Sequence, residues 1–196
     1  KLYAPVRPVP EEKIITKDDN ETLQIGENCT LTFYDTPGHA NHHFCIYDPV
    51  SNGIFTGDTI GIQQPQIEEF GLQLFLPATS PNQFNPDKMI QSMERIKSLG
   101  VERIYFGHYG MTENVEAVYE QLNDWLPVYV NTVREVFNEG QGVEEASTRV
   151  LAKIRERLNE HRVPEDHRIY DILKMDLNVF TMGIIEYLQK KERSGG

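Results

Sequence analysis

Thr36-Pro37-Gly38-His39-Ala40-Asn41-His42-His43 is the stretch on which the fold assignment depends, and its last five residues hold three of the six histidines of the chain. It follows a β-prone run that Pro37 and Gly38 interrupt, so a strand ends here and a loop begins. A neutral imidazole binds Zn²⁺ or Fe²⁺ at about 2.0–2.1 Å, and a strand end fixes its direction. The pattern favours a metal site; the alternative is a polar loop whose histidines are only solvated.

Two later strand ends carry side chains of matching chemistry. Phe55-Thr56-Gly57-Asp58-Thr59 runs from a strand directly into a carboxylate, and Phe106-Gly107-His108-Tyr109-Gly110 places a histidine after a buried strand. A carboxylate can bridge two cations with its two oxygens, and a glycine before it lets the backbone approach closely. Either match alone would be interpreted as a turn. Together with the first stretch, three strand ends present His, Asp and His.

In this order the three stretches resemble the third, fourth and fifth metal motifs of the metallo-β-lactamase superfamily. The resemblance extends from about Lys13 to Trp125 and includes Pro77-Ala78-Thr79 and Phe84. It implies that His39 binds a first metal, that His108 binds a second, and that Asp58 bridges them. His43 resembles a histidine of the glyoxalase II branch that lies near the metals, whereas His42 is expected at the surface. Asp58, His43 and Tyr109 are the candidate catalytic residues, and Tyr109 either donates a hydrogen bond to an oxyanion or only packs.

The most informative motif of that superfamily, His-x-His-x-Asp-His, should precede Thr36. Residues 1–35 contain no histidine. We therefore expect that the chain needs an N-terminal half that it lacks; the alternative is a remnant without function. His39, Asp58 and His108 would be divided between two metals, so this chain by itself should bind metal weakly and be inactive.

The predicted fold class is α+β, a portion of an αββα sandwich followed by a C-terminal helical extension. Residues 1–125 form the sandwich part and 126–196 the extension. Lys13–Thr16 and four later short runs up to Asp58 are predicted to be strands of a meander, and Ile60–Phe84 a long loop over the site. Asn85-Pro86 starts a helix, and Val101–Phe106 is a buried strand.

Three further helices are expected after Thr112, and the last of them has apolar residues on two faces. Met175, Val179 and Met182 form its second stripe. A doubly apolar helix requires two partners, so we expect a homodimer through the C-terminal helices. The alternative is that the absent half, or the helix around Trp125, covers the stripe.

The resemblance implies hydrolysis of a small-molecule ester, thioester or lactone by a hydroxide held at a dinuclear site. The expected cofactors are two divalent metal ions, zinc first, with iron or manganese as alternatives. An iron-dependent sulfur or oxygen redox enzyme of the same fold is a second interpretation. A non-catalytic dimerising module is a third.

Composition limits the partners and the compartment. With 19 basic and 30 acidic residues the formal net charge is −11, which disfavours nucleic acid and anionic membranes as partners. Cys29 and Cys45 lie in apolar, strand-like runs and are expected to be free thiols, which favours a reducing compartment. No run reaches the roughly 20 apolar residues of a membrane span, so a cytoplasmic protein is expected.

Overall fold

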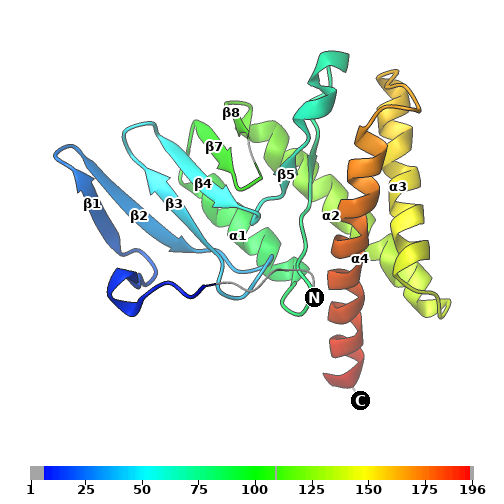
Figure 1. Cartoon of the computed structure of the whole chain (residues 1–196), viewed down its shortest axis with the longest axis horizontal. Coiled ribbons are helices and arrows are strands. Elements are labelled where there is room, and N and C mark those ends of the chain that lie inside the picture. Colours follow the sequence, from blue (N-terminus) through cyan, green and yellow to red (C-terminus); the bar gives the residue numbers. More distant parts are fainter. Residues whose placement is uncertain (1–6, 109, 195–196) are drawn as a thin grey trace.

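The computed structural model describes residues 7–108 and 110–194, and it has a sheet on one side and a helical layer on the other (Figure 1). The sheet order is β1-β2-β3-β4-β7-β8, and every neighbouring pair is antiparallel except β4 and β7. The strands are β1 (Thr22–Gly26), β2 (Cys29–Asp35), β3 (Phe44–Asp48), β4 (Gly53–Gly57), β7 (Arg103–Phe106) and β8 (Met111–Thr112). The predicted α+β class is confirmed.

The described residues contain four α-helices, the first at the predicted start and the other three after Thr112, as expected: α1 (Pro86–Ser98), α2 (Val115–Asn138), α3 (Val143–Glu160) and α4 (Ile169–Ser194). The side chain of Asn85 caps α1 by accepting a hydrogen bond from the Lys88 amide at 3.0 Å. The boundary predicted after residue 125 falls inside α2, which continues through Pro127. Among the helices described, none has the length and apolar character to span a bilayer.

The segment Ile60–Phe84 differs from the long, featureless loop that was predicted. It contains β5 (Ile62–Gln63), the 3-10 helix η2 (Pro65–Phe70) and β6 (Phe75–Leu76). Most of its apolar side chains are buried: Ile60, Ile62, Ile67, Leu72, Leu74, Phe75, Leu76, Ala78 and Phe84. Part of it is attached to α2, because Gln121 hydrogen-bonds the amide of Phe75 and the carbonyl of Gln73 at 3.1 and 3.0 Å. The segment is therefore core, although two-residue strands are too short to show a period in sequence.

The strand predicted at Lys13–Thr16 is also wrong. A short 3-10 turn, η1 (Glu11–Lys13), follows Pro10, and residues 14–18 belong to no strand. Proline fixes φ near the helical value, which suits the first position of a turn.

The two faces of the large sheet are covered unequally. Cys45, Ile54 and Ile104 on one face are fully buried in the same cluster as residues of α1 and α2. On the other face the register aligns Phe33, Ile46, Phe55 and Tyr105 in a row across four strands, which we call the aromatic row. None of its members is buried, and Phe55 is 46% exposed. One apolar face of the sheet thus remains open in the part of the chain that the structure describes.

The last helix has the two apolar faces expected from its sequence. Leu173, Leu177 and Ile184 are buried in the core. Met175, Val179 and Met182, the α4 stripe, are 66%, 40% and 40% exposed. Both cysteines are free thiols, as predicted, but only Cys45 is buried, whereas Cys29, also expected to be buried, is half-buried.

Candidate metal centre

Three strand ends bring the predicted ligands together. His39 follows β2, Asp58 follows β4, and His108 follows β7. Because β4 and β7 are neighbours and parallel, their carboxyl ends lie at the same edge, so Asp58 and His108 meet there. His39 Nε2 lies 3.6 Å from Asp58 Oδ2, and His108 Nε2 lies 3.4 Å from Asp58 Oδ1. Each oxygen of one carboxylate thus faces a different histidine.

The carboxylate of Asp58 has coordination capacity that the protein does not use. Its Oδ1 is buried and has no hydrogen-bond partner among the described residues. Leaving a buried charged oxygen unpartnered is costly, and a cation beside it would remove that cost. In residues 7–108 and 110–194, however, no three His, Cys, Asp or Glu side chains form a group able to hold one metal ion. The donor types fit divalent metals, but these donors form only part of a site.

The ring of His39 is oriented by a backbone carbonyl. Its Nδ1 lies 2.9 Å from the oxygen of Ala78, which can only accept, so Nδ1 carries the proton. The lone pair is then on Nε2, the atom that faces Asp58. Metal-binding histidines in proteins generally have this arrangement, with the second nitrogen donating to a carbonyl or carboxylate.

His43 has a different environment, because both of its ring nitrogens are engaged within the protein. Its Nε2 accepts a hydrogen bond from the Asp58 amide at 3.2 Å, and its Nδ1 donates to Thr59 Oγ1 at 2.7 Å. The Thr59 hydroxyl in turn donates to the Thr36 carbonyl at 3.2 Å. Burial, followed by the nearby His39, lowers the pKa of His43 and favours the neutral ring. This network connects the His43 ring to the backbone at Asp58.

Gly57 and Gly107 allow the strand ends that carry Asp58 and His108 to approach each other closely. Gly57 has φ +50°, and a Cβ there would lie 2.6 Å from His43 Nε2. A Cβ on Gly107 would lie 3.0 Å from the Cα of Gly57, and the Gly107 amide donates to the Gly57 carbonyl at 3.2 Å. Larger residues at these positions would separate the strand end of Asp58 from that of His108.

The remaining predicted site residues have separate outcomes. Tyr109 lies outside the described residues. His42 is exposed, and its Nδ1 lies 3.1 Å from Gln83 Oε1, which agrees with its predicted surface position.

A polar group on α4 was missed by sequence reasoning. Burial raises the pKa of Asp176, while the charge of His108 and a hydrogen bond from Gln64 oppose the shift. The Tyr129 hydroxyl is fully buried and has no hydrogen-bond partner among the described residues. Burial raises the pKa of Tyr129, and the charge of Asp176 raises it further. Asp171, Lys174 and Asn178 are polar neighbours of Asp176 in the same helix, so no signal in the sequence singled it out.

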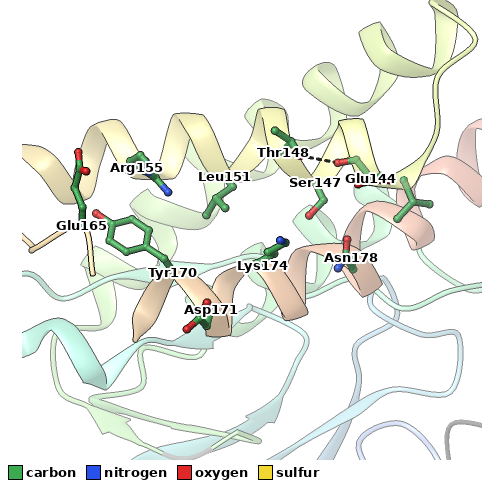
Figure 2. A pocket seen from close by; sticks show the side chains of 11 residues that line it. Glu144, Ser147, Thr148, Leu151, Arg155, Glu165, Tyr170, Asp171, Lys174 and Asn178 are labelled. Atoms are coloured by element: carbon green, nitrogen blue, oxygen red, sulfur yellow. Dashed lines mark hydrogen bonds between the residues drawn. The ribbon is translucent and has the colours of Figure 1, made fainter. Parts of the chain in front are cut away.

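An open groove of about 740 Å³ lies between α3 and α4 (Figure 2). At the edge of this groove, the guanidinium of Arg155 lies over the ring of Tyr170, 4.6 Å from the ring centroid. None of the predicted site residues lines this groove, so it is separate from the candidate metal centre.

Comparison with known families agrees with the geometry. Residues 2–108, more than half of the chain, match the family described as the metallo-beta-lactamase superfamily. The chain belongs to the metallo-beta-lactamase superfamily. A solved metallo-beta-lactamase family protein from Thermus thermophilus matches 96% of the chain and 51% of its own length, with a TM-score of 0.58 and 19% identity. This likeness supports the fold of the superfamily, including its C-terminal helices.

Two further relatives match shorter parts of the chain. An atrochrysone carboxyl ACP thioesterase from Aspergillus fumigatus is 28% identical over 118 residues, 60% of this chain and 31% of the thioesterase. An archaeal metallo-beta-lactamase superfamily protein from Sulfolobus tokodaii has a TM-score of 0.48 and 24% identity, over 59% of this chain and 41% of its own. The chain thus spans between about a third and a half of the length of these three proteins.

Proposed function

We propose that this chain is part of a metal-dependent hydrolase of a small ester, thioester or lactone. The observation that carries the proposal is the carboxylate of Asp58, whose two oxygens face His39 and His108 separately. This is the arrangement expected of a carboxylate that bridges two cations. The thioesterase relative supports hydrolysis of an acyl compound, and superfamily membership supports divalent metals as cofactors.

The residues of this chain have distinct parts in the proposed reaction. His39 would bind one metal and His108 the other, with Asp58 between them. When bound, two divalent metals, zinc first among the candidates, supply Lewis acidity and a nucleophile from water at neutral pH. His43 keeps the Asp58 backbone in place through the hydrogen bond at its Nε2.

The ligand set requires completion by a polypeptide layer outside the described residues. The aromatic row supports this part of the proposal, because Phe33, Ile46, Phe55 and Tyr105 form an apolar sheet face that is open to solvent. Two sheets that pack face to face bury such surfaces between them, about 10 Å apart. We propose that a second sheet covers the aromatic row and supplies the remaining metal ligands.

The test is an assay of the intact protein, including any segment that precedes Lys1, against an ester, a thioester and a lactone. We expect metal-dependent hydrolysis of at least one of them, lost on chelation and restored by Zn²⁺. No hydrolysis by fully metal-loaded protein, together with oxygen consumption on a thiol or persulfide, would replace the hydrolase with a redox enzyme.

The control is the 196-residue chain alone. After dialysis it should retain well under one metal per chain by elemental analysis and show no hydrolysis, because its three donors are divided between two metals. Two tightly bound metals in the chain alone would contradict the proposed second layer.

We further propose that the α4 stripe forms a homodimer interface. Met175, Val179 and Met182 are exposed on one face, and an exposed apolar stripe of this kind often marks a contact between subunits. Light scattering at micromolar concentration should give a dimer for the intact protein and a monomer for Met175→Glu/Met182→Glu. Val50→Glu, at an apolar side chain of the β3–β4 turn with 68% exposure, is the matched control and should remain a dimer. A strict monomer in the unmodified protein contradicts the interface.

A further inference from the structure

The segment Pro77-Ala78-Thr79 lies between the candidate metal centre and α4. The carbonyl of Ala78 accepts the hydrogen bond from His39 Nδ1 at 2.9 Å. The next residue, Thr79, donates its hydroxyl to the carbonyl of Phe180 in α4 at 2.5 Å. Ala78 and Thr79 are each only 1% exposed. Two adjacent buried residues therefore connect a predicted metal ligand to the C-terminal helix.

Helix α4 has a glycine where this segment packs against it. Gly183 follows Phe180 by three residues, and a Cβ there would lie 2.9 Å from both Thr79 Oγ1 and the Ser80 carbonyl oxygen. Glycine inside a helix costs roughly 0.5–1 kcal/mol relative to alanine, so its presence needs a packing reason. The approach of Thr79 and Ser80 to the helix is such a reason.

Further along α4 the same contact continues. Glu186 accepts a hydrogen bond from the amide of Asn82 at 2.5 Å, and Lys190 donates to the Asn82 carbonyl. Together with Phe180 and Gly183, these residues fall on one face of the helix. The segment 79–82 is thus held along more than two turns of α4.

We propose that α4 sets the direction of the His39 imidazole through Thr79 and Ala78, which makes Thr79 a positioning residue of the metal centre. The carbonyl of Ala78 fixes both the tautomer and the rotation of the ring. The position of the Ala78 carbonyl depends in turn on the adjoining Thr79, whose hydroxyl is hydrogen-bonded to α4. The inference goes beyond the proposed function and rests on it only for the role of His39 as a ligand.

The first measurement is the tautomer of His39 in the intact protein, stripped of metal by chelation, by long-range ¹H–¹⁵N NMR. The unmodified protein should show a protonated Nδ1 and a bare Nε2. Thr79→Val removes the hydroxyl at nearly constant volume and should give a mixture of tautomers, whereas Thr79→Ser should restore the single form. Gly183→Ala, which displaces the segment without removing a hydrogen-bonding group, should also give a mixture.

Thr181→Val is the matched control. The hydroxyl of Thr181 is fully buried in the same helix, and it donates to the Leu177 carbonyl at 2.7 Å, within α4 itself. It should lower stability to a similar degree and leave the His39 tautomer unchanged. An unchanged tautomer in folded Thr79→Val, or an equal response in Thr181→Val, overturns the inference.

The second measurement is Zn²⁺ affinity of the intact protein. Thr79→Val should weaken it about 10-fold, the lower end of the range for residues that orient a ligand, and Thr181→Val should not. If the tautomer changes but the affinity does not, α4 still positions His39, and the ligand role of His39 in the proposed function is wrong.

Discussion

Replacement of Asp58 by alanine should lower kcat/KM of the intact protein by more than about 100-fold, beyond the range typical of residues that only orient a ligand. The physical reason is that one carboxylate faces both His39 and His108, so its loss removes negative charge from both proposed metals at once. It also leaves their separation unrestrained. The measurement is steady-state hydrolysis of the best substrate, with metal content determined on the same samples.

His43→Ala is the matched comparison, because the hydrogen bond of its ring to Asp58 is with the backbone amide and not with the carboxylate. A loss of about 10–100-fold is expected, as for other groups that orient a metal ligand. If His43→Ala were the more damaging change while metal content stayed full, His43 would act on the substrate, and Asp58 would not be the bridging ligand.

Gly38→Ala should destabilise the protein by about 2–6 kcal/mol, the sum of backbone strain and overpacking at about 1–3 kcal/mol each. Gly38 has φ +143°, and a Cβ there would lie 2.5 Å from the backbone nitrogen of Met89 in α1. The Gly38 carbonyl also accepts from the Asn85 amide at 2.8 Å, so the loop of His39 rests directly on the start of α1. Since the free energy of unfolding of a domain is only about 5–15 kcal/mol, this one methyl group should remove a large part of it.

Urea unfolding provides the measurement, and Gly71→Ala is its control. Gly71 also has a positive φ, +73°, but nothing lies within 4 Å of a Cβ built there. Its cost should be limited to the left-handed backbone, about 1–2 kcal/mol. Equal losses for the two variants would mean that the contact with α1 has no part in stability.

The residues with strong local signals were predictable from sequence. The three ligand stretches lie at strand ends, as expected, because proline and glycine interrupt β-prone runs at Pro37 and Gly57. Asn85 and Pro86 gave the start of α1 correctly. The exposed position of the α4 stripe also followed from helical spacing.

The features that were missed depend on contacts distant in sequence. Nothing in the pattern of Ile60–Phe84 shows that it is core, and its hydrogen bonds to α2 and α4 join it to residues far away in the sequence. The acceptor for His39 is a backbone carbonyl, and because every residue has one, the sequence does not reveal which residue provides it. The hydrogen bonds that both ring nitrogens of His43 make within the protein could not be predicted from the sequence.

The single parallel pair in the sheet implies an order of assembly during folding. The meander from β1 to β4 joins strands that follow each other closely in the chain, and such local pairs form early. The pairing of β7 with β4 must wait until the crossover through β5, β6 and α1 has closed, because non-local contacts carry a loop-closure entropy. We therefore expect the strands β2 and β4 to be in place first and the strand end of His108 to join them last.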